Sequence, residues 1–230
     1  MRAILFDVFG TLVDWRSSLI EQFQALERQL GTLPCVELTD RWRQQYKPAM
    51  DRVRNGQAPW QHLDQLHRQS SRGPGRRVRP GAGRGPAATH HWLVPARPWP
   101  DTLAGMHALK ADYWLAALNN GNTALMLDVA DAGLPWDMLP CADLFGHYKP
   151  DPQVYLGACR LLDLAPAGGD ALRGAQLRPQ GRARPRPARP RRSPWPLEYG
   201  PGQSRTSPPS RTGLIASDLL DLHRQLAASA

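Results

Sequence analysis

Two short apolar runs that end in polar residues stand out along the chain. Residues 3–6 (Ala-Ile-Leu-Phe) end at Asp7, and residues 113–118 (Tyr-Trp-Leu-Ala-Ala-Leu) are followed by Asn119-Asn120-Gly121-Asn122. Uninterrupted apolar runs of this length are typical of strands buried on both faces of a parallel sheet. Open α/β sheets place their chemistry where such strands end. We therefore predict an α/β fold with a Rossmann-like parallel sheet, in which the first strand delivers the carboxylate of Asp7 to the functional edge.

Apolar residues at helical spacing predict helices between and after these strands. We expect one helix over about 17–30, a second from a cap at Thr39 or Asp40 through about 54, and a third over about 57–69. Further helices are expected from Asp101, after Asn122, over 151–162 and from Ser217. The helix over 151–162 has an apolar face that we predict to be buried, formed by Val154, Tyr155, Ala158, Leu161 and Leu162.

The first strand leads into a motif that indicates nucleophilic chemistry. Residues 7–13 (Asp-Val-Phe-Gly-Thr-Leu-Val) resemble the first motif of the haloacid dehalogenase superfamily, in which the Asp is the nucleophile. Phosphatases of that superfamily usually carry a second Asp two positions later, which protonates the leaving oxygen beside a magnesium ion. Phe9 stands at this position, and its side chain can neither bind a metal nor donate a proton. The motif therefore favours carbon–halogen chemistry, because a halide leaves without protonation.

Three further segments strengthen the resemblance. Residues 118–122 (Leu-Asn-Asn-Gly-Asn) resemble the Leu-Ser-Asn-Gly-Asn of 2-haloacid dehalogenases, with Asn119 in the place of the Ser. Residues 148–155 resemble their Tyr-Lys-Pro-Asp…Val-Tyr motif, in which the ammonium of Lys149 would hold Asp7 ionised. Residues 42–46 (Trp-Arg-Gln-Gln-Tyr) resemble their Trp-Arg-Gln-x-Gln segment, whose Arg lines the substrate pocket, and Arg43 can bind a carboxylate or a departing halide.

The resemblance to (S)-2-haloacid dehalogenases implies an architecture and a set of roles. Residues 1–14 and 98–230 would form the α/β core, and residues 15–97 a small helical cap inserted after the first strand. The implied catalytic residues are Asp7, Thr11, Lys149 and Tyr155. The implied substrate-binding residues are Val8, Phe9, Arg43, Asn119 and Asn120.

The same resemblance implies a reaction. Asp7 would displace halide from an (S)-2-haloacid, and water would hydrolyse the resulting aspartyl ester to an (R)-2-hydroxy acid. The expected partners are a 2-haloalkanoic acid and water, together with a second copy of the chain in a homodimer. No metal, organic cofactor or nucleic acid is expected. Two alternatives stay open, which are a magnesium-dependent phosphatase of the same superfamily and an Arg-rich nucleic-acid-binding protein.

Cysteine usage and hydropathy indicate a protein of the cytoplasm. Cys35, Cys141 and Cys159 are an odd, scattered set, which does not suggest a disulfide framework or a metal site. The first residues form a strand pattern rather than a basic-then-apolar leader. No apolar run approaches the roughly 18 residues of a membrane span. We therefore expect neither export nor membrane insertion.

The composition contradicts this picture in two places. The net charge is +9, but residues 71–100 hold six Arg and no acid, and residues 173–192 hold eight Arg and no acid. Without these fourteen arginines, 15 Lys and Arg remain against 20 Asp and Glu. Both segments lack apolar periodicity, and their Arg, Pro, Gly and Ala are residues of GC-rich codons. The strand expected near 171–179 cannot form from this sequence, because Pro and unpaired Arg are excluded from central strands.

We interpret residues 70–97 and 166–196 as segments read out of frame relative to the functional gene. Residues 175–181 (Ala-Gln-Leu-Arg-Pro-Gln-Gly) can be written in codons that, shifted by one base, read His-Asn-Tyr-Asp-Leu-Lys. This resembles the fourth dehalogenase motif, which supplies an Asn and an Asp to the site. The rival interpretation is that these segments are linkers that bind nucleic-acid phosphates. That account must explain why they interrupt a domain and contain only Trp92 and Trp195 for base stacking.

Sequencing of the source gene tests the frame interpretation. We expect compensating single-base insertions or deletions that bracket residues 70–97 and 166–196. A gene that encodes both Arg-rich segments without such changes, relative to an active relative, would refute the interpretation. The gene sequence also shows whether the codon for Asn119 differs from a Ser codon by one base.

Overall fold

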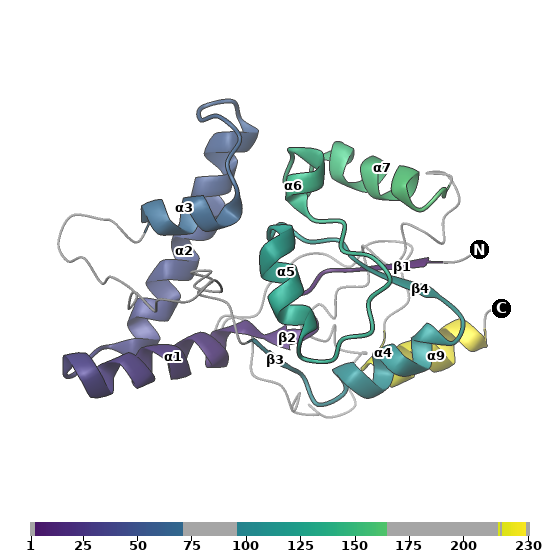
Figure 1. Ribbon diagram of the computed structural model, residues 1–230, viewed down its shortest axis with the longest axis horizontal. Coiled ribbons are helices and arrows are strands. Elements are labelled where there is room, and N and C mark those ends of the chain that lie inside the picture. Colours follow the sequence, from purple (N-terminus) through teal and green to yellow (C-terminus); the bar gives the residue numbers. More distant parts are fainter. Residues whose placement is uncertain (1–2, 71–95, 165–215, 217, 229–230) are drawn as a thin grey trace, which may run out of the picture.

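A pair of parallel strands forms the centre of the protein, shown in Figure 1 as a computed structural model that describes residues 3–70, 96–164, 216 and 218–228. Strand β1 (Ala3–Phe6) pairs in parallel with β4 (Trp114–Ala117) along their whole length. An isolated parallel bridge then joins Ala116 of β4 to Met138. The predicted α/β fold with a parallel sheet is therefore confirmed.

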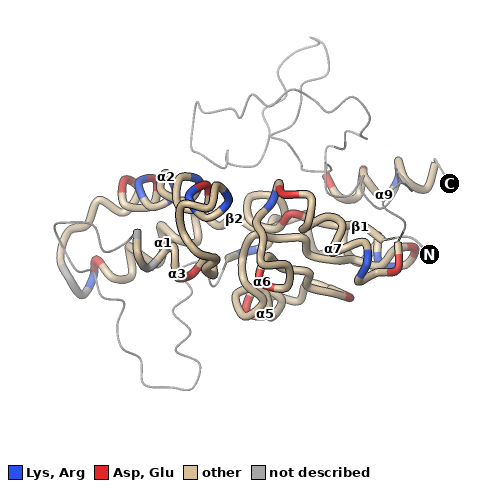
Figure 2. Tube along the Cα trace, turned by 90° about the horizontal axis from the view of Figure 1, so that it is seen from above, with Lys and Arg blue, Asp and Glu red and all other residues tan. Residues whose placement is uncertain are grey.

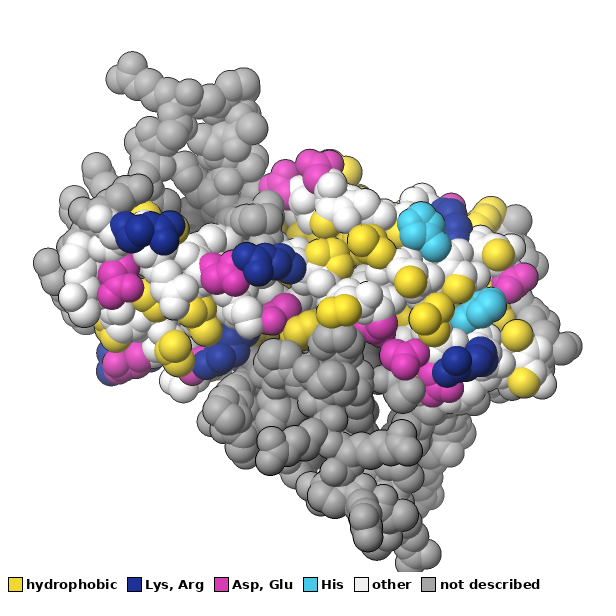
Figure 3. All heavy atoms as spheres, turned by 90° about the horizontal axis from the view of Figure 1, so that it is seen from below, with side chains coloured by type: hydrophobic (Ala, Val, Ile, Leu, Met, Phe, Trp, Pro, Cys, Tyr) yellow, Lys and Arg dark blue, Asp and Glu magenta, His cyan; other side chains and the backbone are white. Residues whose placement is uncertain are grey.

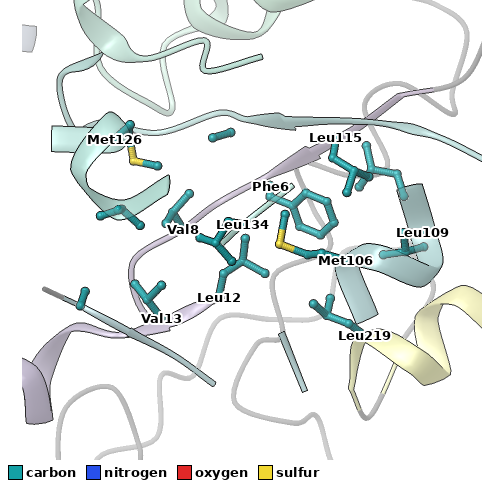
Figure 4. Packing of buried hydrophobic residues seen from close by; sticks show 14 of the residues in the cluster. Phe6, Val8, Leu12, Val13, Met106, Leu109, Leu115, Met126, Leu134 and Leu219 are labelled. Carbon is teal, nitrogen blue, oxygen red and sulfur yellow. The ribbon is translucent and has the colours of Figure 1, made fainter. Parts of the chain in front are cut away.

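Helices α4 and α9 cover one face of this sheet. Ile4 and Phe6 of β1 point into an apolar cluster that also contains Met106 of α4 (Thr102–Lys110) and Leu219 of α9 (Leu219–Ala227). Figure 4 shows the ring of Phe6 lying over Met106, with Leu109 and Leu115 beside it. The two helices approach closely at Gly105, where an added Cβ would lie 2.2 Å from the Leu219 Cβ. A side chain at this position would force the two helices apart.

Helix α7 (Pro152–Leu161) covers the opposite face of the sheet. Alternate residues of a strand point to opposite sides, so Leu5 lies away from Phe6 and packs with Val154 and Ala158 of α7. Helices on both faces of a parallel sheet give the layered arrangement of doubly wound α/β proteins. Two shorter helices complete this part of the molecule, α5 (Thr123–Ala130) and α6 (Ala142–Phe145).

Three helices lie to one side of these layers in Figure 1: α1 (Trp15–Leu30), α2 (Cys35–Arg54) and α3 (Leu63–Ser70). The chain leaves β1 through β2 (Val13–Asp14) and returns through β3 (Arg97–Pro98), and these two short strands pair antiparallel. The two connections are therefore held together, next to the place where the predicted cap begins and ends.

Helix α1 begins two residues before the predicted start, because Asp14 caps it and accepts a hydrogen bond from the Ser17 amide at 3.0 Å. The prediction that Thr39 or Asp40 caps the second helix is wrong, since α2 begins at Cys35. The Asp40 carboxylate instead forms a bidentate ion pair with Arg16 of α1, with contacts of 2.8 and 2.9 Å. It therefore joins two helices rather than capping one.

The third and seventh helices also differ from their predictions. Residues 57–62 are not helical, and α3 begins at Leu63. Pro59 disfavours a helical conformation of the residue before it, and Gln65 reaches back to accept from the His62 amide at 3.1 Å, as in a capping box. In α7 the predicted apolar face is correct for Val154 but not for Leu161, which is 51% exposed among the described residues.

Charges of both signs cover the described elements. Helix α2 carries basic and acidic residues side by side in Figure 2, including ion pairs of Asp51 with Lys47 and with Arg54. Figure 3 likewise shows Lys, Arg, Asp and Glu side chains together on one face. In this view the described part of the chain presents no uniformly basic surface. The Arg-rich segments, and the strand expected near 171–179, lie outside the described residues.

Two further observations concern the cysteines and the length of the helices. Cys35, Cys141 and Cys159 are all described, and each is a buried free thiol. Within residues 3–70, 96–164 and 218–228, no helix is long and apolar enough to cross a membrane.

Candidate active site

The loop after β1 holds Asp7 at the end of the strand. The Val8 carbonyl accepts hydrogen bonds from the amides of Thr11, Leu12 and Val13 at 3.1, 2.8 and 3.3 Å. Gly10 permits this tight turn because its φ is +83°. The loop is therefore closed on itself by its own backbone, which fixes the direction in which Asp7 leaves the sheet.

Both carboxylate oxygens of Asp7 have partners. Lys149 Nζ lies 2.6 Å from Oδ1, and the Thr11 hydroxyl donates to Oδ2 at 3.2 Å. The Lys149 ammonium also donates to the Leu118 carbonyl at 2.6 Å, and its side chain is only 8% exposed. An ion pair that is largely shielded from water is strong and geometrically restrained. These contacts hold Asp7 as an oriented carboxylate.

The two asparagines after β4 have different surroundings. The Asn119 carbonyl oxygen accepts from the Gly121 amide at 3.2 Å, and its amide nitrogen lies 3.0 Å from the Met126 sulfur, so its side chain is engaged within its own loop. The Asn120 side chain instead accepts from the Lys149 backbone amide at 2.6 Å. It also donates to the Tyr46 hydroxyl at 3.3 Å. Asn120 therefore joins the lysine segment to helix α2.

Arg43 lies between two aromatic rings. Its guanidinium carbon is 5.0 Å from the centroid of the Trp15 ring and 4.2 Å from that of Tyr46. Contacts of this kind stabilise a cation on the face of an aromatic ring. The two rings restrict the Arg43 side chain, so its positive charge stays on the α2 side of the site.

A buried histidine adds to this aromatic group. The His67 ring packs on Trp42 at 4.3 Å and on Tyr46 at 5.9 Å between centroids. Burial, together with the positive charge of Arg43, lowers the pKa of His67 to about 3. His67 is therefore neutral at physiological pH, and it adds no second positive charge beside Arg43.

Phe9 and Val8 contribute in different ways. The Val8 side chain is buried in the apolar cluster, close to Met126 in Figure 4, so only its backbone can serve the site. Phe9 is half-buried and packs between that cluster and the one around Trp15. Phe9 therefore adds an apolar side chain to the loop that follows Asp7. Among the residues that the structure describes, no group of three His, Cys, Asp or Glu side chains could hold a metal ion.

Tyr155 lies on the opposite side of the sheet from Phe6. It is partly buried and packs against the cluster that contains Leu5, Val154 and Ala158. Its helix, α7, begins directly after the segment that carries Lys149. Tyr155 thus contributes to the packing of this helix, and its catalytic role stays a prediction. Hydrogen bonds and the Tyr46 ring connect Asp7, Thr11, Lys149, Asn120 and Arg43 around one site.

Sequence reasoning missed two contributors. Tyr46 had no assigned role, although its position three residues after Arg43 places both side chains on one face of a helix. Arg54 also had no assigned role. Its guanidinium forms an ion pair with Asp151 at 2.7 Å, and this contact ties the end of α2 to the segment that follows Lys149. The neighbouring Asp151 carboxylate raises the pKa of Arg54 above its usual range.

A groove of about 740 Å³ lies elsewhere, between α1 and α2, where its lining includes Glu27, Cys35 and Asp40. Neither Asp7 nor Lys149 lines it. The chemistry therefore belongs to the residues around Asp7 and not to this groove.

Comparisons with known proteins agree with this arrangement. A family model described as haloacid dehalogenase-like hydrolase matches residues 1–172. The crystal structure of the L-2-haloacid dehalogenase PA0810 is 67% identical, covers 99% of both chains and superposes with a TM-score of 0.78. The defluorinating L-2-haloacid dehalogenase Rha0230 is 33% identical, over 99% of this chain and 95% of that one, with a TM-score of 0.72. The (S)-2-haloacid dehalogenase 1 of Pseudomonas sp. (strain CBS-3) is 29% identical over 174 residues, which are 73% of each protein.

Proposed function

The chain belongs to the haloacid dehalogenase-like hydrolase family, and from this premise we propose that it converts (S)-2-haloacids to (R)-2-hydroxy acids and halide. The observation that carries the proposal is the Asp7 carboxylate, held by Lys149 at 2.6 Å and by Thr11 at 3.2 Å, with the apolar Phe9 two positions further along the chain. An oriented carboxylate with an apolar residue in place of a second Asp suits attack on a carbon–halogen bond. The similarity to L-2-haloacid dehalogenases supports the same substrate class.

In the first step, a lone pair of an Asp7 oxygen forms a bond to C2 of the substrate from the side opposite the halogen. The carbon–halogen electron pair leaves with the halide. The backbone amides of Val8, Phe9 and Asn120 bind the substrate carboxylate at the strand ends, and Arg43 stabilises the departing halide. Because C2 is attacked once, its configuration inverts.

In the second step, water attacks the carbonyl carbon of the Asp7 ester and not C2. The C2–oxygen bond is kept, the ester bond to the Asp7 carbonyl breaks, and the departing oxygen takes one proton of the water to become the product hydroxyl. The other proton of the water is released as Asp7 returns to the carboxylate form. Lys149 stabilises the negative charge that develops on the ester oxygen. The Asn and Asp of the expected fourth motif, of which the Asp is our candidate base for this water, are absent from residues 175–181 as the chain reads, and this segment lies outside the described residues.

Helices α1 to α3 serve as the cap of this enzyme. The proposed division has residues 15–97 as the cap and residues 1–14 and 98–230 as the core, and the structure describes residues 15–70 and 96–97 of the first and 3–14, 98–164, 216 and 218–228 of the second. The β2–β3 pair at the junction supports this division. The site then lies between Asp7 and Lys149 from the core and Arg43 from the cap.

Halide release from (S)-2-chloropropanoate tests the proposal. We expect the protein expressed from its source gene to release chloride and to form (R)-lactate, with the same rate in the presence of EDTA. The (R) enantiomer should react far more slowly, because its halogen would not lie opposite Asp7. Magnesium-dependent hydrolysis of p-nitrophenyl phosphate without chloride release would instead establish the phosphatase alternative.

A further inference from the structure

Tyr46 lies where Asp7, Arg43 of α2 and the asparagine loop after β4 come together. It lies on α2, and its ring is 4.2 Å from the guanidinium carbon of Arg43. Its hydroxyl oxygen accepts a hydrogen bond from the Asn120 amide at 3.3 Å. The carbonyl oxygen of the same Asn120 side chain accepts from the Lys149 amide at 2.6 Å. Tyr46 is therefore connected by one side chain to the segment that pairs with Asp7.

The hydrogen bond from Asn120 uses the oxygen of this hydroxyl as an acceptor, so its hydrogen can be donated to another group. A phenol has one hydrogen to donate and an oxygen that accepts. Burial raises the pKa of Tyr46, while the charge of Arg43 and hydrogen bonds from Asn120 and Arg43 act in the opposite direction. The phenol therefore stays protonated at neutral pH. Because Asn120 donates to its oxygen, the O–H bond is polarised and becomes a stronger donor to a third group.

In the proposed reaction this third group is the leaving halogen, which faces α2. Burial is the main cause of the raised pKa of Tyr46, and the Asp7 charge acts in the same direction. Asp7 comes from the end of β1, whereas Arg43 and Tyr46 both come from α2. A displacement with inversion needs the leaving group opposite the nucleophile. With Asp7 on the sheet side, the halogen points toward α2 and its two donors.

We propose that Tyr46 is a catalytic residue that donates its hydroxyl hydrogen to the halogen as the carbon–halogen bond breaks. This inference rests on the proposed dehalogenase function. The electron pair of the broken bond stays on the halide, the new bond forms between C2 and an Asp7 oxygen, and Tyr46 keeps its proton throughout. Arg43 supplies the positive charge, and Tyr46 supplies a directed hydrogen bond that grows as negative charge develops on the halogen.

The test compares Tyr46→Phe with the unchanged enzyme on (S)-2-chloropropanoate and (S)-2-bromopropanoate. Halide release is followed in a single turnover with enzyme in excess, so that ester hydrolysis does not mask the first step. We expect release of chloride to slow by about 10- to 100-fold, and release of bromide to slow clearly less. Chloride is the stronger hydrogen-bond acceptor and the poorer leaving group, so it depends more on a donor. The KM for both substrates should change little.

Tyr148→Phe is the matched control. It also removes a buried phenol hydroxyl, which donates to the Gln61 carbonyl at 2.7 Å. Any effect of this variant should be equal for the two substrates. An equal loss for both substrates in Tyr46→Phe, no loss at all, or a rise in KM alone would overturn the inference. Absence of halide release from the unchanged enzyme would instead refute the dehalogenase function itself.

Discussion

Replacing Asp7 by Asn is expected to abolish halide release, with a fall in kcat of about five orders of magnitude, as for other catalytic nucleophiles. An amide nitrogen or oxygen does not displace halide, whereas the side chain keeps its shape. Its oxygen can face the Lys149 ammonium, which lies 2.6 Å from Oδ1 in the unchanged protein. Its NH₂ group can donate to Thr11, whose hydroxyl rotates to accept. The variant should therefore fold normally, which circular dichroism and thermal unfolding can verify.

Asp131→Asn is the matched control for this variant. Asp131 is an exposed residue after α5, so the same change of charge there should alter kcat by less than about twofold. Measurable halide release by Asp7→Asn, at more than a thousandth of the original rate, would contradict the assigned nucleophile. Asp7→Ala excludes slow hydrolysis of the new amide as the source of residual activity.

A single turnover in oxygen-18 water shows whether the Asp7 ester forms. With enzyme in excess, the first hydroxy acid should carry an unlabelled oxygen, because that oxygen comes from Asp7. The label should appear in the Asp7 carboxylate. Trypsin releases residues 3–16, which also contain Asp14, and fragmentation of this peptide must place the label on Asp7 and not on Asp14. Label in the product of the first turnover would show direct attack of water on C2.

The sequence predicted the central strands well because each is a short apolar run with a polar end. Leu5 and Leu115 are fully buried, and their strands pair along their whole length, so a continuous apolar pattern was sufficient. Helix starts were predicted less well. Asp40 looks like a helix cap in the sequence, but its ion pair with Arg16 joins residues that are 24 positions apart. Local patterns contain no information about such a contact.

Residues of the site could be predicted only where a known motif implies a contact between residues that are far apart in the sequence. Asp7 and Lys149 are 142 residues apart, and only the resemblance to dehalogenases suggested that they meet. The surroundings of Arg43 could not be predicted, because the Trp15 ring comes from α1 and its contact depends on how two helices pack. Tyr46 could have been found from its helical spacing to Arg43. The fourth motif, expected near 171–179, stays a prediction.

Removal of the Lys149 ammonium is the second change with a large expected effect. Lys149→Met keeps the length of the side chain but leaves the Asp7 carboxylate and the Leu118 carbonyl without the donor that lies 2.6 Å from each. Loss of one partner of a shielded ion pair destabilises a protein by about 3 kcal/mol. We also expect kcat to fall by about 100- to 1000-fold, because the ester oxygen loses its stabilising charge. Thermal unfolding and single-turnover halide release measure the two effects separately.

Two further variants show whether position or charge matters at Lys149. Lys149→Arg keeps the charge, but a planar guanidinium does not fit the space of an ammonium whose side chain is 8% exposed, so activity should stay low. Lys47→Met is the matched control, because that side chain is 79% exposed and pairs with Asp51 on the surface of α2. Its kcat should stay within about twofold. If Lys149→Met remained folded and released halide at the original rate, Lys149 would be a structural residue, and Asp7 would act without an ammonium partner.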